Sequence, residues 1–390
     1  MNSRIYLDYN ATTPIHPEIL PYIQDNLKFF GNPSSVHWAG RETKKILTAT
    51  RRAVSESLHC DPLEVVFTSS GSEGNNLALK GALADFQNAR REIVCSEVEH
   101  PSVLKTIEHL RAKGYVIRFL KVSRGGEISL EDYANLLSEK TALVTCQLVN
   151  NETGNIFPIK KMARLAHQHG ALFHSDMVQS LGKIPVDLSA LDVDYATFAG
   201  HKFYSLKGSA FLFVKKGSHL SSLVHGGGQE RGRRAGTENT LALGSLGEAF
   251  RLLMPRLEET TARISTWRDK LEADILAKIP GARVNGAQGK RVGNTLNVSF
   301  DRTDGETLLI NLDTRGFAVS SGAACSSGSQ EPSPVLTHMG LTQEEASQSL
   351  RISLGWLTTE EQIELFLKNL ILSVDQIRRI HDENIERELA

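Results

Sequence analysis

The amino-acid sequence predicts an α/β protein with a large domain built on a mostly parallel seven-stranded sheet and a smaller α+β domain. Short apolar runs alternate with stretches of helical period between residues 63 and 214, the pattern of a parallel sheet covered by helices. After the glycine-rich cluster at 225–237, long charged helical stretches precede a few short strand-like runs. A chain of 390 residues is long enough to bury more than one hydrophobic core.

Seven short apolar runs predict the strands of the large sheet. Runs of this kind, bounded by turn residues, are typical of buried strands. Ligands of such sheets bind at the carboxyl ends of the strands, so the turns that follow these runs are the first candidates for a functional site. The predicted strands span 63–68, 92–96, 115–120, 141–149, 171–175, 194–198 and 209–214.

The remaining stretches divide into helices and a second unit. The stretch 69–76 (SSGSEGNN) is predicted to be a glycine-rich turn, and 239–279 one long helix. The large domain is predicted to span 16–258, and the small domain 1–15 together with 259–390. The other helices of the large domain are predicted over 17–29, 41–58, 77–86, 101–113, 130–137 and 159–169. In the small domain, a short strand is predicted over 5–7, the stretches 291–300, 305–314, 318–320 and 351–354 suggest an α+β unit, and a last helix spans 360–381.

Composition excludes several classes of function. The net charge is −1 and 23% of residues are charged, so we expect no binding to nucleic acid or to membranes. No apolar run is long enough to span a bilayer, and the first residues lack the apolar segment of a signal peptide; we therefore expect a cytoplasmic protein. The spacing of the four cysteines, Cys60, Cys95, Cys146 and Cys325, predicts neither a metal site nor disulfides, and Cys95 and Cys146 are expected to be buried and inert.

Polar residues follow five of the predicted strands where each strand ends. Any one of them, taken alone, is more often a turn residue or a helix cap. Because a sheet brings the ends of its parallel strands to one edge, we expect the five to lie in a single cleft. These residues are Ser72, His100, Asn151, Asp176 and Lys202.

This set suits one cofactor. Lys202 follows the buried run YATFA, and desolvation there favours the neutral, nucleophilic amine. Ser72, with Gly71 and Gly74, opens a helix whose amides form an anion cradle, although the glycine spacing matches neither a P-loop nor a dinucleotide motif. A phosphate cradle, a buried carboxylate, an imidazole and a desolvated lysine together favour pyridoxal 5′-phosphate.

The chain resembles the cysteine desulfurases of the class V aminotransferase family, which are pyridoxal-phosphate enzymes of fold type I. The similarity runs from YLDYNATTP at 6–14 to SLGWLTTEEQ at 353–362. The order and spacing of the motifs over this length make the resemblance far more specific than any one motif. The motifs are GNPSS (31–35), VFTSSGSEGNNLA (66–78), EVEHPSV (97–103), VNNETG (149–154), AGHK (199–202), HGGGQERGRRAGT (225–237) and SSGAACSSGSQEPSPVL (320–336).

The resemblance implies a role for each candidate residue. Lys202 would be the Schiff-base lysine and His100 a stacking acid–base group; these two are catalytic, together with Cys325. Thr237 would reach the phosphate of the other subunit, which implies a homodimer with shared sites. The other implied contacts are Asp176 to the pyridine nitrogen, Gln179 to the phenolic oxygen, Gly71, Ser72 and His201 to the phosphate, and Asn151 and Arg351 to the substrate carboxylate.

Cys325 distinguishes the reaction. It lies in a run of small residues, SSGAACSSGSQEPSP, which predicts a mobile loop and resembles the long-loop type of the family. In the family, the thiolate of this cysteine attacks the sulfur of L-cysteine, so the resemblance implies that L-alanine forms and a persulfide remains on Cys325. The resemblance also implies a sulfur acceptor, either an iron–sulfur scaffold or another acceptor protein such as one that serves tRNA thiolation, and the sequence leaves open which of them it is.

Other functions stay open at this point. A selenocysteine lyase or another class V aminotransferase uses the same cofactor and fold, although a pure aminotransferase needs no cysteine loop. A sulfur carrier or redox partner without the cofactor is the alternative that is not an enzyme, because Ala199 and Ser205-Leu206 replace residues usual in the family near the phosphate. A serine hydrolase is set aside, because Ser70 stands where a nucleophile elbow needs glycine.

Overall fold

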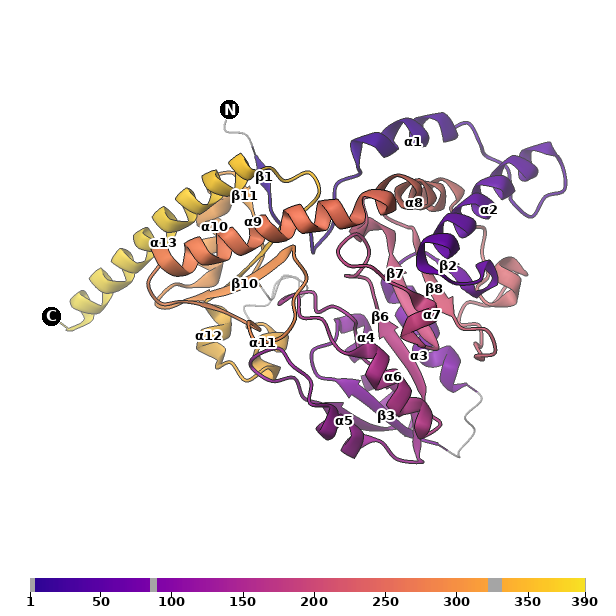
Figure 1. Ribbon diagram of the computed structural model, residues 1–390, viewed down its shortest axis with the longest axis horizontal. Coiled ribbons are helices and arrows are strands. Elements are labelled where there is room, and N and C mark those ends of the chain that lie inside the picture. The colour runs from indigo at the N-terminus through magenta and orange to yellow at the C-terminus, as the bar shows by residue number, and fades with distance from the viewer. Residues whose placement is uncertain (1–3, 85–89, 322–331, 390) are drawn as a thin grey trace.

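A seven-stranded sheet organises the first two thirds of the protein. The structure, a computed structural model, describes residues 4–84, 90–321 and 332–389, and Figure 1 shows its arrangement. The strand order is β2-β8-β7-β6-β5-β3-β4, which confirms the predicted α/β fold. The strands are β2 (Val65–Thr68), β3 (Glu92–Ser96), β4 (Val116–Leu120), β5 (Thr141–Thr145), β6 (Leu172–Asp176), β7 (Tyr195–Ala199) and β8 (Ala210–Val214).

Only β8 runs against the others in this sheet. It pairs antiparallel with both β2 and β7, whereas the other pairs are parallel. β2, β3, β5, β7 and β8 are buried along their whole length, as expected for strands covered on both faces. The carboxyl ends of β2, β3, β5, β6 and β7 therefore meet at one edge of the sheet, which is the edge where the candidate residues follow.

Helices cover this sheet and continue into a second layer. α2 packs on α8 closely enough for Thr50 Oγ1 to donate to Leu243 O at 3.1 Å, and a Cβ on Gly247 would lie 2.7 Å from Thr50 Oγ1. Glycine is therefore needed at that contact. The helices of this part are α1 (Leu20–Asn26), α2 (Trp38–Leu58), α3 (Gly71–Leu83), α4 (Pro101–Ala112), α5 (Leu130–Leu136), α6 (Ile159–Gln168), α7 (Leu188–Leu191) and α8 (Thr240–Leu253).

The stretch 69–76 is not the predicted turn, because α3 already begins at Gly71. Ser70 caps the helix by accepting a hydrogen bond from Glu73 N at 3.1 Å, which compensates for the low helix propensity of glycine. A Cβ on Gly74 would lie 2.7 Å from Thr197 Cγ2 on β7. The glycine thus allows the helix to pack tightly on the sheet, and the first turn of α3 is placed at the sheet edge.

Several other boundaries differ from the prediction. The strand predicted over 63–68 begins at Val65, after a 3-10 turn over Pro62–Glu64, the run 291–300 is a strand only from Thr295, and the helix predicted over 360–381 continues to Leu389. The single helix predicted over 239–279 is two helices, α8 and α9 (Leu257–Lys278), joined by a 3-10 turn over Met254–Arg256. Pro255 lies in this turn and cannot donate the hydrogen bond that a continuous helix needs. β5 ends at Thr145, four residues before the predicted end of that strand.

The last third of the chain forms a second layer around a small antiparallel sheet. β10 (Thr295–Phe300) lies between β9 (Ala282–Val284) and β12 (Ser349–Ser353). The N-terminal strand β1 (Ile5–Tyr6) joins this layer by pairing with β11 (Phe317–Ala318). Its helices are α10 (Gly305–Thr314), α11 (Pro334–His338), α12 (Gln343–Ser347) and α13 (Glu360–Leu389), the last of which projects from the body of the molecule in Figure 1.

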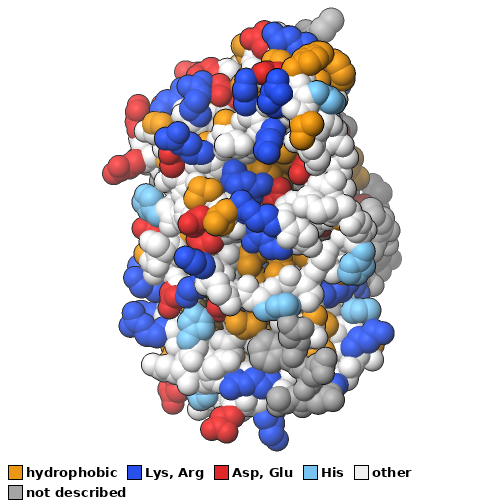
Figure 2. Space-filling view, turned by 90° about the vertical axis from the view of Figure 1, so that its right-hand side faces the viewer, with side chains coloured by type: hydrophobic (Ala, Val, Ile, Leu, Met, Phe, Trp, Pro, Cys, Tyr) orange, Lys and Arg blue, Asp and Glu red, His pale blue; other side chains and the backbone are white. Residues whose placement is uncertain are grey.

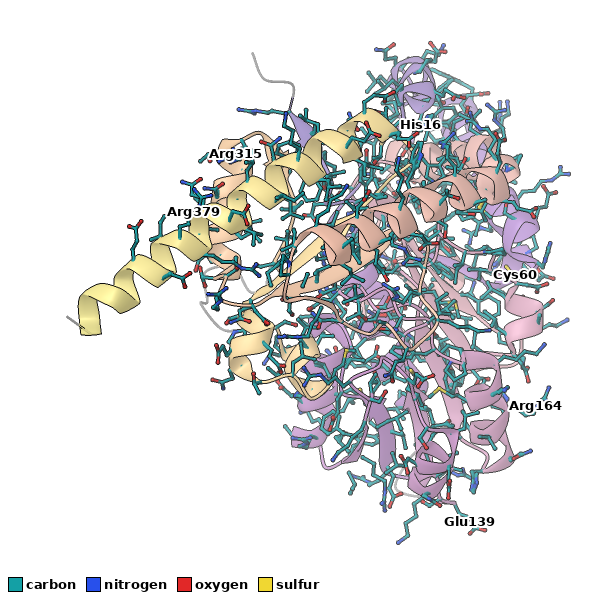
Figure 3. All side chains as sticks on the ribbon, turned by 60° about the vertical axis from the view of Figure 1, so that its left-hand side comes forward. His16, Cys60, Glu139, Arg164, Arg315 and Arg379 are labelled. Carbon is teal, nitrogen blue, oxygen red and sulfur yellow. The ribbon has the colours of Figure 1, made fainter. Side chains whose placement is uncertain are left out.

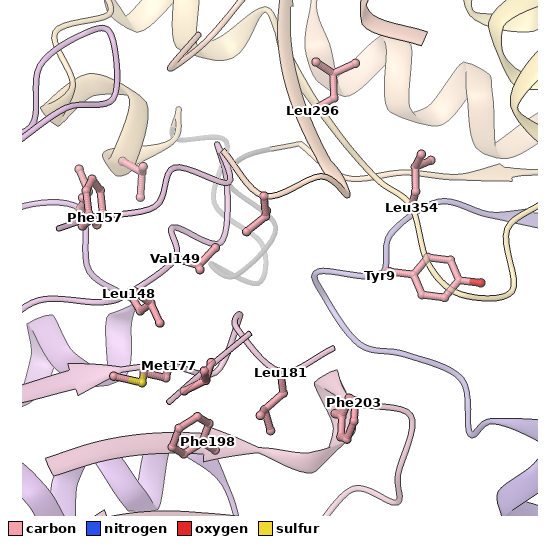
Figure 4. Close-up of a cluster of buried hydrophobic side chains, with 14 of the residues drawn as sticks. Tyr9, Leu148, Val149, Phe157, Met177, Leu181, Phe198, Phe203, Leu296 and Leu354 are labelled. Atoms are coloured by element: carbon pink, nitrogen blue, oxygen red, sulfur yellow. The ribbon is translucent and has the colours of Figure 1, made fainter. Parts of the chain in front are cut away.

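One hydrophobic core joins the two layers. Figure 4 shows Met177, the residue after β6, and Phe198 of β7 in the same buried cluster as Leu296 of β10 and Leu354, the residue after β12. Burying these side chains completely contributes about 1.5–3 kcal/mol each, so the layers are held together by apolar packing as well as by hydrogen bonds. Among the described residues, no helix is long and apolar enough to cross a membrane.

Candidate active site

A cavity of about 370 Å³ lies at the edge of the large sheet where the five strands end. This volume is in the range of small-molecule sites. Both layers contribute to the walls, because Arg351 comes from β12 and the other predicted residues come from the large sheet and its helices. The predicted site residues that line it are Gly71, Ser72, His100, Asn151, Asp176, Gln179, His201, Lys202 and Arg351.

Lys202 reaches the cavity from the 3-10 turn over Gly200–Lys202 that follows β7. Its Nζ donates to two backbone carbonyls of the N-terminal segment, Asn10 O at 2.6 Å and Ala11 O at 2.5 Å. The side chain is half-buried. The amine is therefore held at a fixed point of the cavity wall.

Asp176 ends β6 and is almost fully buried, with 6% of its surface exposed. Its Oδ1 accepts from Val178 N at 2.9 Å, and its Oδ2 accepts from Asn75 Nδ2 at 2.7 Å. Asn75 lies on α3 and Val178 in the segment after β6, so two different elements hold the two oxygens of the carboxylate. This carboxylate is fixed in the wall and is suited to pair with a protonated ring nitrogen.

His100 caps the N-terminus of α4. Its Nδ1 accepts from Ser102 N at 3.1 Å and lies 2.8 Å from Ser102 Oγ. Burial lowers the pKa of His100 below the usual value for histidine, and the charge of Asp176 opposes this shift. The imidazole is thus mainly neutral at neutral pH and can accept a proton.

The start of α3 forms the anion-binding end of the cavity. Ser72 is exposed at the first turn of this helix, where free amides and the helix dipole favour a phosphate. A Cβ on Gly71 would lie 2.8 Å from Val178 Cγ2, so a larger residue there would have to displace the Val178 side chain. His201 lies nearby with Nδ1 3.1 Å from Thr12 Oγ1, and burial lowers its pKa to about 4, so the ring is neutral.

Gln179 follows Asp176 and is tied to the N-terminal segment. Its Nε2 donates to Asn10 O at 2.9 Å, and its Oε1 accepts from Lys183 Nζ. Lys183 is itself buried, and burial together with the charges of Lys202 and Arg351 holds its pKa well below the usual value for lysine. The amide of Gln179 is therefore bonded at both ends.

Arg351 forms the opposite wall. Its Nη2 donates to Asp8 Oδ1 at 2.8 Å, and its Nη1 donates to Asn151 O at 3.1 Å. Only 2% of this residue is exposed. Its Nε and the Oδ1 of Asn151 are buried and have no hydrogen-bond partner in the described part of the chain. A buried donor beside a buried acceptor, both unsatisfied, is the arrangement expected of a site that awaits a polar ligand.

Two predicted residues are not placed in the cavity. Thr237 is exposed in the segment that precedes α8, and it does not line the cavity. Cys325 lies outside the described residues. Of the other cysteines, Cys95 and Cys146 are fully buried and burial raises their pKa values well above the usual thiol value; Cys60, whose pKa burial raises to about 12, lies at an outer edge of the molecule (Figure 3).

Several residues that hold the site were missed by the sequence analysis. Asn10 and Asp8 lie in the YLDYNATTP motif, yet nothing local to that motif indicates that their partners are Lys202 and Arg351. Asn75 lies in the stretch that was predicted to be a turn; a correct helix assignment would have placed it one turn beyond Ser72, on the helix that faces Asp176. No local signal could have identified Lys183, because a buried lysine has the same sequence context as an exposed one.

These residues fit pyridoxal phosphate. The cavity offers a helix start for the phosphate, the buried carboxylate of Asp176 for the ring nitrogen, and a lysine within the same wall. The unsatisfied Oδ1 of Asn75, beside Asp176, is a further polar atom without a partner among the described residues. In the same part of the chain, no group of three or more His, Cys, Asp or Glu side chains is arranged to hold a metal ion.

The comparison with protein families gives an independent result. The family model of the class V aminotransferases matches residues 5–366. A cysteine desulfurase of Trichormus azollae is 41% identical over 382 residues, which cover 97% of this chain and 94% of the relative. The cysteine desulfurase NifS of Azotobacter vinelandii is 40% identical over 381 residues, which cover 96% of this chain and 94% of that protein.

The comparison with solved structures agrees. A NifS-like protein superposes with a TM-score of 0.89 at 34% identity, and the match covers 95% of this chain and 99% of the other. Matches that span nearly the whole length of both partners leave no large part of this chain without a counterpart. The resemblance read from the motifs is thereby confirmed: the chain belongs to the class V aminotransferase family and, within it, to the cysteine desulfurases.

Proposed function

We propose that this protein is a cysteine desulfurase that uses pyridoxal phosphate to convert L-cysteine to L-alanine and retains the sulfur on Cys325. The observation that carries the proposal is the single cavity that Lys202, Asp176 and Arg351 line together. An amine, a buried carboxylate and a buried guanidinium in one cavity of this size suit an amino-acid substrate bound to this cofactor.

The cofactor is expected at the end of the cavity formed by the large sheet. Lys202 would carry it covalently, Asp176 and Gln179 would bind its ring nitrogen and phenolic oxygen, and His100 would stack on the ring. The phosphate would lie at the start of α3, within reach of Gly71, Ser72 and His201. When bound, the cofactor supplies an electron sink for the electrons released at the substrate α-carbon.

The substrate carboxylate is expected at Arg351. Its buried Nε has no partner in the described residues, and the neighbouring Oδ1 of Asn151 is likewise unsatisfied. A carboxylate would satisfy the guanidinium, and the side-chain nitrogen of Asn151, the donor of that amide, would complete the binding site. A charge-assisted hydrogen bond of this kind contributes about 1.5–3 kcal/mol. This contact fixes which end of the amino acid faces the cofactor.

Proton transfer is assigned to His100. Because burial lowers its pKa, the ring is neutral at neutral pH and can take the proton of the substrate thiol or of Cys325. The Cys325 thiolate would then form a bond to the substrate sulfur as the carbon–sulfur bond breaks. The sulfur remains on Cys325 as a persulfide and is passed to an acceptor, an iron–sulfur scaffold or another sulfur-acceptor protein.

A homodimer is part of the proposal. Four large apolar side chains are strongly exposed between α1 and the start of α2: Leu27, Phe30, Val36 and Trp38. Figure 2 turns that side of the molecule toward the viewer and shows apolar side chains exposed near its top. Apolar groups gathered in this way favour burial against another protein surface, and the exposed Thr237 is then available to the cavity of the second subunit.

The experiment that tests the proposal follows sulfur to Cys325. The purified protein is incubated with L-cysteine, and a mass increase of one sulfur atom on the peptide that contains Cys325 is expected. The Cys325→Ala variant should keep the yellow cofactor but release no sulfide, whereas Cys60→Ala, the matched control, should keep both. Full sulfide release by Cys325→Ala would show that another residue receives the sulfur. Turnover of selenocysteine with little or no turnover of cysteine would instead favour the selenocysteine lyase.

A further inference from the structure

A second lysine, Lys183, is buried beside the cavity and has no part in the chemistry proposed above. Its exposed fraction is 9%, and its Nζ donates to Asn10 Oδ1 at 2.8 Å and to Gln179 Oε1. Both partners are neutral amide oxygens, and no ion pair of Lys183 is found among the described residues. Burying an amine that is not paired with a carboxylate is costly, so filling space does not account for a lysine at this position.

The two amides that Lys183 contacts are both held in one orientation. Asn10 Nδ2 donates to Asn151 O at 3.1 Å and to Thr295 Oγ1 at 2.9 Å, which leaves Asn10 Oδ1 to face Lys183. Gln179 Nε2 donates to the backbone carbonyl of Asn10 at 2.9 Å. Since a carbonyl only accepts hydrogen bonds, Gln179 Oε1 must lie at the other end of the amide, where the Lys183 amine donates to it.

The local backbone brings Gln179 and Lys183 together. Lys183 N donates to Ser180 O at 3.1 Å, so the segment after Asp176 follows a helical turn. Side chains four residues apart lie on the same side of such a turn. The Asn10 carbonyl that accepts from Gln179 also accepts from Lys202 Nζ, at 2.6 Å. Lys183 therefore contacts Gln179 directly, and Asn10, which bonds to both lysines, links Lys183 to Lys202.

We propose that Lys183 is a positioning residue that holds the Gln179 amide so that its nitrogen, and not its oxygen, is presented to the cofactor. The inference rests on the proposed function, in which Gln179 binds the phenolic oxygen of pyridoxal phosphate. That oxygen accepts hydrogen bonds when it is ionised, so a misplaced amide oxygen would repel it. Lys183 acts through Gln179 and does not touch the cofactor.

A double-mutant cycle on cofactor binding tests this role. The cofactor is removed from the wild type and from Lys183→Met, Gln179→Ala and the double variant, and the dissociation constant of added pyridoxal phosphate is measured. Lys183→Met leaves the buried Gln179 oxygen without its donor and should weaken binding about tenfold. In the Gln179→Ala background, the same change should weaken binding less than about twofold, because the group through which Lys183 acts is gone.

The visible absorbance of the cofactor is the second readout. Lys183→Met and Gln179→Ala should shift the absorbance maximum in the same direction, and the double variant should not shift it further. Lys160→Met replaces an exposed lysine at the start of α6 and should change neither readout. Lys183→Gln, whose amide ends one bond short of the lysine nitrogen, is measured in parallel so that the cycle can be completed if Lys183→Met does not fold.

The outcomes separate this inference from the function on which it rests. If the wild type does not bind pyridoxal phosphate, the proposed function fails. If the wild type binds it and Lys183→Met binds equally well, or if the effects of the two single changes simply add, Lys183 has only a structural role and the inference is overturned. Loss of affinity that disappears in the Gln179→Ala background supports it.

Discussion

Groups on the two walls of the cavity differ in how far along the sequence their partners lie. On the wall formed by the large sheet, Asp176 and His100 each accept a hydrogen bond from a backbone amide two residues further along the chain. On the opposite wall, Arg351 is held by Asp8, 343 residues away in the sequence, and by the carbonyl of Asn151, 200 residues away. Local turns and caps thus orient Asp176 and His100 in part, although Asp176 also bonds to Asn75 and Lys202 bonds to Asn10. Among the described residues, the guanidinium of Arg351 has distant partners alone.

The two walls should control different kinetic constants. The sheet wall carries the groups assigned to the cofactor, so changes there should act on kcat and on cofactor binding. The C-terminal wall carries the group assigned to the substrate carboxylate, so changes there should act on KM. A change in the sheet wall that altered only KM, or a change in the C-terminal wall that altered only kcat, would contradict this assignment.

The largest effect is expected from Asp176→Asn. The variant keeps the shape of the side chain and loses the charge that would keep the ring nitrogen protonated, so kcat for L-cysteine should fall on the order of a hundredfold or more. Steady-state sulfide release measures it. Asp192→Asn, which loses an exposed ion pair with Lys215, serves as the control and should keep normal kcat. A change confined to KM would move Asp176 to the substrate side of the cavity.

Arg351→Ala should have the next largest effect, and this effect should be on KM. Removing a buried partner of the carboxylate should raise KM by about 10- to 100-fold with a smaller change in kcat. The measurement is the dependence of the initial rate on L-cysteine concentration. Arg52→Ala removes an exposed arginine paired with Glu56 and should leave KM unchanged. An unaltered KM in Arg351→Ala would mean that the carboxylate is bound elsewhere.

Asp8→Asn should have a smaller effect of the same kind. The amide retains an oxygen that can accept from Arg351, but the charge that orients the guanidinium is lost, so KM should rise about three- to tenfold. Asp269→Asn is the matched control, because Asp269 is an exposed partner of Arg268. If Asp8→Asn instead lowered KM, Asp8 would be competing with the substrate for Arg351 and not orienting it.

The smallest effect is expected at Glu99, a buried residue with 1% of its surface exposed. Its Oε1 accepts from Gln147 N at 2.8 Å, whereas its Oε2 has no partner in the described residues, and burial raises the pKa of this carboxyl from 4.5 to about 8. The folded state favours the protonated form, so the stability that Glu99 contributes is complete below pH 4.5 and is lost as the pH rises through about 8.

Glu99→Gln should therefore flatten the dependence of stability on pH. Between pH 5 and pH 8, the melting temperature of the wild type should fall more than that of the variant, by on the order of a few degrees. Thermal unfolding followed by circular dichroism at a fixed heating rate measures both, with Glu108→Gln as the exposed control. Parallel curves for wild type and Glu99→Gln would show that Glu99 is ionised in the folded protein.

The same contrast in range explains what could be predicted from the sequence. The strand over Glu92–Ser96 is predicted with its observed bounds, because an apolar run between turn residues is a local signal. The gathering of five strand ends also follows from local signals, since it needs only the order of strands and helices. Asp176, His100 and Lys202 could be named on that basis, because each stands close to the end of a predicted strand.

Residues whose partners lie far away in the sequence could not be identified from local signals. The helix that starts at Gly71 was hidden by its glycines, which are there because Thr197, far along the chain, packs against Gly74. Asp8 has no local feature that indicates Arg351 as its partner. Lys183 looks like any surface lysine until the structure shows it buried against Asn10 and Gln179. In each case, the missing information is tertiary packing.

The pairing of β1 with β11, and of Asp8 with Arg351, has a consequence for the synthesis of the protein. Strands β2 to β8 are complete once residue 214 has left the ribosome, and the groups assigned to the cofactor of the same subunit are then all present. Within the N-terminal segment, Asn10 and Ala11 can meet Lys202 at that stage. Strand β1 and Asp8 have to wait for residues 317–318 and 351 before they find their partners. A nascent chain can therefore assemble the wall assigned to the cofactor early, whereas the site assigned to the substrate carboxylate forms only when translation is nearly finished.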